Sequence, residues 1–168
     1  MIKALKAIAI LSFFSLLLIS CGGKEEKKKE SITIQNKTET KTVVDKAENL
    51  PASKKVDLEN KGIGPITSVT LSPEIDQAMV SHGAEVYKKM CTACHRSDKK
   101  FIGPAPSGIL ERRSPEWIMN MILNPEEMVQ KDPLAKELLI EFNGSPMANQ
   151  NLTEEEARAV LEYFRTLK

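Results

Sequence analysis

The sequence predicts an all-α protein, in which about four helices form one small domain behind a disordered N-terminal tether. Between residues 73 and 168, a capping residue, a proline or acidic first turn and apolar residues three and four positions apart recur four times. No stretch alternates apolar and polar residues over a useful strand length. Residues 21–72 are instead rich in Lys, Glu, Thr and Ser and contain no aromatic residue. We therefore expect three parts: residues 1–20, 21–72 and 73–168.

Residues 1–20 have the pattern of a secretory signal peptide. Lys3 and Lys6 give a positive start, and residues 7–19 form an apolar run that is too short to span a membrane comfortably. The run ends in LISC, whose last residue is Cys21, and this resembles the lipobox of bacterial lipoproteins. The resemblance implies cleavage before Cys21 and acylation of that residue, which gives stable anchoring when two or more chains are attached. We expect an exported domain on the periplasmic side of a membrane; an ordinary signal peptide with a chance cysteine is the alternative.

Residues 21–72 form the predicted linker. It opens with the mixed charge run KEEKKKE, and its apolar residues are sparse. Such a segment cannot bury enough apolar surface to offset the entropy of ordering it. A flexible chain of this length has an r.m.s. reach on the order of 40 Å, so we expect the linker to let the domain move above the membrane. A passive spacer is the alternative.

The C-terminal domain is expected to contain four helices. The first spans 73–90, with Ser72 as its cap and a proline in its first position. The second begins at Ser114-Pro115 and ends before Asn124, and the third runs from Asp132-Pro133 to Asn143-Gly144. Thr153 and Glu156 form a capping box at the start of the fourth. The expected buried positions are Ile75, Met79, Val86, Tyr87, Met90, Trp117, Ile118, Met121, Ile122, Leu134, Leu138, Leu139, Phe142, Ala157, Val160, Leu161 and Phe164.

A C-x-x-C-H pattern, formed by Cys91, Cys94 and His95, follows the first expected helix. The pattern indicates attachment of a c-type haem, in which two thiols add to the haem vinyl groups and the histidine binds iron. We expect one covalent haem c per chain. A redox dithiol would need a βαβ setting, and a zinc site would need four ligands, whereas the chain has three cysteines and two histidines. These two alternatives and a plain disulfide remain open.

Residues 73–168 resemble the monohaem cytochromes c of the small helical, His/Met-ligated type. Gly83 and Tyr87, spaced by four before Cys91, resemble the first helix of that family, and residues 103–112 resemble the loop after its haem motif. A domain with so thin a core would pack its helices on the macrocycle. The resemblance therefore implies a cytochrome c fold wrapped around haem.

The resemblance also implies roles for three residues near the haem. The carbonyl of Pro104 is expected to accept the second N–H of His95, which fixes the tautomer and raises the basicity of the ligand. Arg112 is expected to approach a haem propionate, with a solvated surface arginine as the alternative. Trp117 is expected beside a propionate or the ring, with an ordinary buried aromatic as the alternative.

Met147 is the expected second axial ligand. The family places its distal methionine in a loop before the last helix, and Met147 lies in such a loop, at 143–149. The other six methionines lie at the N-terminus, beside the haem motif or in or near helix patterns, where methionine usually fills a core. His82 is a weaker candidate, because it lies shortly before the motif. His/Met ligation fills both axial positions and raises the reduction potential, so the iron should cycle between Fe(II) and Fe(III).

The resemblance implies a membrane-tethered one-electron carrier and not an enzyme. Redox proteins are the expected partners, with a quinol-oxidising complex as donor and a terminal oxidase or anaerobic reductase as acceptor. The alternative is a haem protein whose labile Met147 allows gas or peroxide sensing or catalysis. The domain carries 12 Lys and Arg against 15 Asp and Glu and has no nucleic-acid motif, and a monomer is expected. Five basic residues near the motif form either a docking patch or a solvated face: Lys88, Lys89, Arg96, Lys99 and Lys100.

Overall fold

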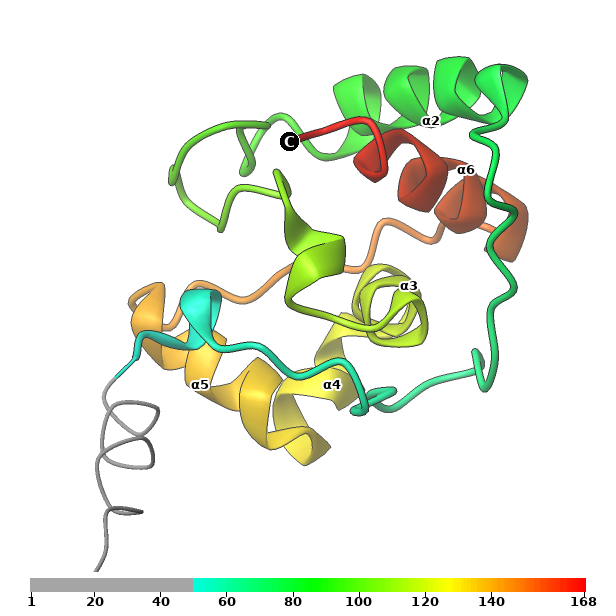
Figure 1. Ribbon diagram of the computed structural model, residues 1–168. Helices are drawn as coiled ribbons and strands as arrows, with labels where there is room; N and C mark the ends of the chain where they lie inside the picture. The colour runs from blue at the N-terminus through cyan, green and yellow to red at the C-terminus, as the bar shows by residue number, and fades with distance from the viewer. Residues whose placement is uncertain (1–49) are drawn as a thin grey trace, which may run out of the picture. The chain divides into compact units, whose positions relative to one another are not determined.

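Five α-helices and two short 3-10 helices make up residues 50–168, the part of the chain that this computed structural model describes (Figure 1). In chain order they are η1 (Ala52–Lys54), α2 (Gln77–Met90), η2 (Ile109–Glu111), α3 (Pro115–Leu123), α4 (Pro125–Lys131), α5 (Pro133–Glu141) and α6 (Glu154–Phe164). Over this range there is no strand, only an isolated bridge between Asp57 and Arg113. The all-α prediction is confirmed. None of the helices within residues 50–168 has the length and apolar character needed to span a membrane.

The first long helix, α2, begins at Gln77, and the predicted start at Pro73 is wrong. Its cap is Asp76 and not Ser72, because the Asp76 carboxylate accepts hydrogen bonds from the backbone N–H groups of Ala78 and Met79 at 2.9 and 3.0 Å. A carboxylate in this position satisfies two of the unpaired N–H groups of the first turn and lies at the positive end of the helix dipole.

Prolines begin the next three helices. Before α3, Ser114 Oγ accepts the backbone N–H of Trp117 at 3.1 Å, and before α5, Asp132 Oδ1 accepts that of Ala135 at 2.8 Å. These two helices and α6 start where the sequence predicts, and α6 has the expected capping box. The short helix α4 was not predicted. Pro125 ends α3 and also occupies the first position of α4, where its fixed φ suits a helix start.

Helices α2 and α6 pack closely against each other (Figure 1). A Cβ atom at Gly83 would lie 2.0 Å from the carbonyl oxygen of Ala159, so this contact needs glycine. One turn further along α2, Tyr87 contacts the rings of Tyr163 and Phe164, with centroid distances of 5.5 and 5.7 Å. The pair α2–α6 therefore carries the start of the haem motif on a rigid support.

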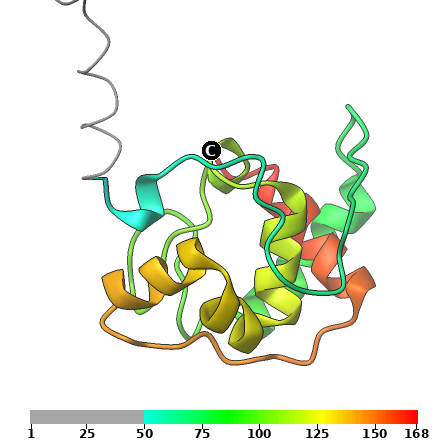
Figure 2. The same cartoon turned by 90° about the horizontal axis from the view of Figure 1, so that it is seen from below.

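Residues 50–72, called here the N-terminal segment, were predicted to belong to a flexible linker, but they pack against the helical domain (Figure 2). Asn120 in α3 binds both peptide groups of Ile66 and the carbonyl of Lys61, at 2.9 to 3.0 Å. Four apolar side chains of the segment pack on the core: Ile63, Ile66, Val69 and Leu71. The prediction failed because average composition does not register single apolar and polar residues that find partners far along the chain. The predicted signal peptide, Cys21 and residues 22–49 lie outside the described residues.

Candidate haem-binding site

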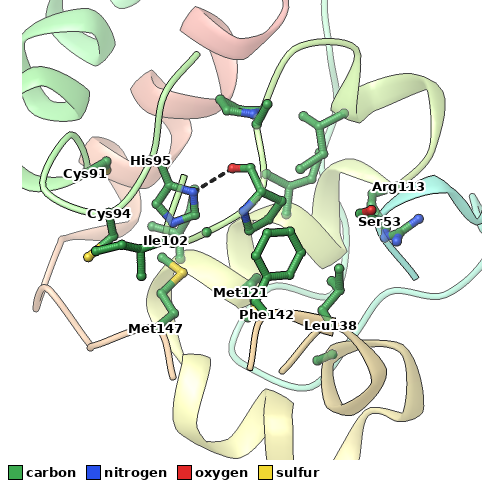
Figure 3. A pocket seen from close by; sticks show the side chains of 18 of the residues that line it. Ser53, Cys91, Cys94, His95, Ile102, Arg113, Met121, Leu138, Phe142 and Met147 are labelled. Carbon is green, nitrogen blue, oxygen red and sulfur yellow. Dashed lines mark hydrogen bonds between the residues drawn. The ribbon is translucent and has the colours of Figure 1, made fainter. Parts of the chain in front are cut away.

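A mostly apolar pocket opens between the C-terminal end of α2, the loop before η2, the helices α3 and α5, and the loop before α6 (Figure 3). Its apolar wall includes Ile118, Met121, Ile122, Leu138, Leu139 and Phe142. The haem-motif residues and Met147 lie at one end of the pocket, and Ser53 and Arg113 lie at the other (Figure 3). The pocket therefore combines an apolar interior with sulfur and nitrogen donors at one end and a cation at the other.

Cys91 and Cys94 lie on one turn directly after α2. The backbone N–H groups of Cys94 and His95 donate to the carbonyl of Cys91 at 3.1 and 2.9 Å, which closes the turn. Neither cysteine forms a disulfide, and both line the pocket. Burial, with a further contribution from Cys94, raises the pKa of Cys91 to about 11, so this thiol is neutral at pH 7. Two thiols on one turn are what two bonds to a single macrocycle require.

The ring of His95 is fixed from two sides. Its Nδ1 lies 2.8 Å from the carbonyl oxygen of Pro104, the contact that the resemblance implies. Because a carbonyl only accepts, Nδ1 carries the proton and Nε2 has a free lone pair for a metal. On the other side, a Cβ atom at Gly103 would lie 2.4 Å from His95 Cε1, so glycine is required for the loop to pass the ring. Loop 103–104 therefore sets both the tautomer and the orientation of the imidazole.

Met147 lies in the loop between α5 and α6 and lines the same pocket as His95. Its side chain points toward the His95 ring in Figure 3. Positive φ angles at Asn143 (59°) and Gly144 (70°) turn the chain out of α5 and begin this loop. The exposed side chain of His82, by contrast, lies on α2 and does not line the pocket.

Arg112 and Trp117 both line the pocket, but their polar groups have protein partners. Arg112 donates to the carbonyls of Gly108 and Ser107 at 2.8 and 3.0 Å, within its own loop. Trp117 is buried, and its Nε1–H donates to Asp132 Oδ1 at 3.2 Å. The indole N–H is therefore committed to Asp132, and Trp117 lines the pocket as a buried aromatic residue.

Two pocket residues, Arg113 and Ser53, were missed from the sequence. Arg113 is only 3% exposed, and its guanidinium donates to the carbonyls of Ala52 and Lys55 in the N-terminal segment. Ser53 belongs to the segment predicted as linker, and both its backbone N–H and its hydroxyl donate to the carboxylate of Glu141, at 2.8 and 2.6 Å. No local pattern marks Ser53, and the contacts of both residues join positions 58 to 88 apart. In the sequence, the pair Arg112-Arg113 after the motif loop was the signal that could have pointed to Arg113.

The basic residues near the motif are not uniformly solvated. Arg96 stacks on Phe101, with 4.1 Å from Cζ to the ring centroid, and Lys100 Nζ lies 4.5 Å from the centroid of Phe142. Phe101 and Ile102 are each 47% exposed. This face therefore presents apolar side chains together with cations.

The pocket fits a haem. Its apolar walls suit the macrocycle, its two thiols suit the vinyl groups, and the arginines suit the anionic propionates. The hydroxyl of Tyr87 is the one buried side-chain polar atom among residues 50–168 without a hydrogen-bond partner, and Tyr87 also lines the pocket. A buried hydroxyl without a partner is costly, so the pocket is incomplete without a further group.

A sequence profile described as cytochrome c matches residues 80–168. The chain belongs to the cytochrome c family. Members of this family bind haem c covalently, and Cys91 and Cys94 lie in the haem-binding region, so the cofactor here is covalent haem c. The general function of the family is electron transfer.

Solved structures agree with this assignment. Cytochrome c from Rhodothermus marinus is 46% identical, with a TM-score of 0.59, and the match covers 61% of this chain and 87% of that one. An engineered cytochrome c from the same organism is 45% identical, with a TM-score of 0.59 and coverage of 61% and 88%. A structure of the engineered protein bound to a carbene intermediate is 46% identical, with a TM-score of 0.56 and the same coverage. No curated protein matched the chain.

Proposed function

We propose that this cytochrome c is a one-electron carrier whose haem iron has His95 and Met147 as axial ligands. The observation that carries the proposal is that both side chains line one apolar pocket and point toward each other (Figure 3). When bound, the haem supplies the Fe(II)/Fe(III) couple, and two protein ligands leave no axial position for substrate.

Each protein residue at the site has a distinct task. Cys91 and Cys94 hold the macrocycle, and the Pro104 carbonyl holds the His95 Nδ1 proton so that Nε2 faces the pocket. The apolar wall excludes water, which favours a small structural change between the two oxidation states. The arrangement serves electron transfer because the ligands stay in place.

We further propose that the protein is exported and anchored through an acylated Cys21 on the periplasmic side of a membrane. The LISC sequence supports this, and so does the haem motif, since haem c is attached outside the bacterial cytoplasm. The proposed donor is a quinol-oxidising complex, and the proposed acceptor is a terminal oxidase or an anaerobic reductase. The exposed Phe101 and Ile102, with Arg96 beside them, offer an apolar and basic surface that suits an acidic partner.

The axial assignment is tested by the absorption spectrum of the haem-loaded protein beside its Met147→Ala variant. We expect the ferric protein to have the weak far-red band of a methionine–iron bond and the variant to lose it. Met79→Ala is the matched control, because Met79 lies on α2 and does not line the pocket, and it should keep the band.

The same samples distinguish a sensor or enzyme from a carrier. A labile Met147 would let carbon monoxide bind the ferrous protein at neutral pH, whereas a carrier with two firm ligands should bind it only in the Met147→Ala variant. Wild-type protein that carries haem but lacks the far-red band and binds carbon monoxide would contradict the carrier proposal.

A further inference from the structure

The exposed large apolar side chains gather where the chain enters the described domain. Among residues 50–168, seven such side chains are exposed, and three of them lie within the first nine residues of this range: Leu50, Val56 and Leu58. A fourth, Ile140, is 72% exposed on α5. Single exposed apolar residues are common on protein surfaces, but a gathered group of them marks an interaction site.

The segment around η1 lies beside the end of α5, which brings these side chains together (Figures 1 and 2). The carboxylate of Glu141 accepts the N–H and the hydroxyl of Ser53 at 2.8 and 2.6 Å, and Lys55 pairs with Glu137. Ile140 directly precedes Glu141 and follows Glu137 by three positions, so it stands next to both of these contacts. The exposed residue of α5 is therefore a neighbour of residues 50–58.

The chain after η1 turns its apolar side chains outward. Lys55 and Asp57 are partly buried, whereas Val56 and Leu58 are 66% and 53% exposed. Successive side chains of an extended chain point to opposite sides, so Val56 and Leu58 share the outer side. Two lysines of the same region are also exposed, Lys54 in η1 and Lys136 one turn before Ile140. These residues form a surface called here the tether face: Leu50, Lys54, Val56, Leu58, Lys136 and Ile140.

The tether face begins where the proposed lipid anchor joins the domain. Only 28 residues, 22–49, separate Cys21 from Leu50, and even a fully extended chain of this length spans at most about 100 Å. The anchor would keep the domain at a high local concentration beside lipid, so a weak contact is sufficient. Apolar side chains enter the headgroup region of a bilayer, and lysines attract anionic lipids, so the composition of the tether face suits a lipid surface.

We propose that the tether face rests on the lipid surface to which Cys21 anchors the protein. The inference rests on the proposed anchor and not on the axial ligands of the haem. It also gives the domain an orientation. Ser53, beside the tether face, lies at one end of the haem pocket, and Cys91 and Cys94 lie at the other (Figure 3). The haem-motif end of the pocket therefore points away from the lipid, where it is open to a redox partner.

Photo-crosslinking from lipid tests the proposal on the full-length, haem-loaded protein. The acylated protein is reconstituted into vesicles of phosphatidylethanolamine and phosphatidylglycerol, in which part of the phosphatidylethanolamine carries a diazirine on its headgroup. Mass spectrometry then locates the labelled residues. We expect labels on residues 50–58 and at Ile140, and none at Phe101 or Ile102, which are equally apolar and exposed but lie near the haem motif.

Variants of the face make the test quantitative. Ile140→Gln should lower the labelling of residues 50–58 several-fold, because it removes an apolar contact with lipid without altering the residues that are measured. Lys136→Gln should lower it in the same anionic vesicles. Ile75→Gln is the matched control, because Ile75 is also exposed but lies before α2, and it should leave the labelling unchanged. The haem absorption spectrum verifies that each variant has folded.

The other outcomes separate this inference from the anchor. An acylated protein with labels only before residue 50 would contradict the inference and leave the anchor intact. Labels at Phe101 and Ile102 instead of the tether face would contradict the proposed orientation. Amine crosslinks between Lys54 or Lys136 of two chains, with the lipid labels lost, would show that a second copy covers the face. An intact mass without acyl chains would overturn the anchor and this inference together.

Discussion

At the scale of single residues, the geometry of the site depends on a few close contacts around the His95 ring. Gly103 allows the loop to pass the His95 ring, and the Pro104 carbonyl holds the Nδ1 proton. Tyr87 differs from these, because its hydroxyl is buried and has no hydrogen-bond partner within residues 50–168. Burial first, and then the nearby Cys91, raise its pKa to about 12 from the ordinary value of 10.

This shift predicts a loss of stability in alkali. Below pH 10 the Tyr87 hydroxyl is neutral in both the folded and the unfolded chain, so its ionisation does not yet lower the free energy of unfolding. Between pH 10 and about 12 the unfolded chain releases the proton and the folded chain keeps it, so stability falls by about 1.4 kcal/mol per pH unit. Tyr87→Phe should remove this part of the loss.

The measurement is the free energy of unfolding against pH for wild type, Tyr87→Phe and Tyr163→Phe. Tyr163 contacts the same aromatic cluster but is half-buried, so Tyr163→Phe should retain the alkaline loss. Parallel curves for wild type and Tyr87→Phe above pH 10 would show that the Tyr87 hydroxyl ionises as easily in the folded protein as in the unfolded chain.

At the scale of elements, the contact between α2 and α6 supports the haem motif. Gly83 lets the two backbones approach, and Glu162 links the helices from the other side, because its buried carboxylate accepts the backbone N–H of Asp76 at 3.0 Å. Burial acts to raise the pKa of Glu162, but bonds from Arg158 and Asp76 and the charge of Arg165 outweigh it and lower that pKa. The carboxylate therefore stays charged at neutral pH.

Gly83→Ala should destabilise the protein. In an open helix the change would add about 0.5–1 kcal/mol of stability, but here the new Cβ would lie 2.0 Å from a backbone oxygen, and overpacking costs about 1–3 kcal/mol or more. Chemical denaturation should show a net loss, whereas Ser81→Ala, on the exposed face of α2, should have little effect. A Gly83→Ala variant more stable than wild type would mean that the helices separate without cost.

At the scale of the whole molecule, the N-terminal segment extends the domain beyond the family match, which begins at residue 80. Asn120 joins the segment to α3 through three hydrogen bonds, and Ile63 N–H donates to Met128 Sδ at 2.9 Å. Residues 50–72 are thus part of the folded unit, and Ser53 of this segment lines the haem pocket.

Asn120→Ala should weaken this attachment. It leaves the Ile66 N–H and two carbonyls without their partner, at a cost of about 1–3 kcal/mol for buried groups. Hydrogen exchange should show lost protection at the Ile66 amide, and the free energy of unfolding should fall. Asn149→Ala removes a bond of 3.4 Å to the Leu123 carbonyl and one of 2.8 Å from the Asn151 N–H, both at an exposed site, and should leave the protection of the Ile66 amide unchanged. Equal protection in the two variants would mean that apolar contacts alone hold the segment.

The sequence by itself determined the haem motif, the all-α fold and the starts of α3, α5 and α6, because these depend on neighbouring residues. A capping side chain bonds N–H groups two or three positions along, and C-x-x-C-H is complete within five residues. Only the tertiary structure decided that residues 50–72 belong to the domain and that Ser53 and Arg113 lie at the pocket. Their contacts join positions up to 88 residues apart, and such pairs meet only after the helices have packed.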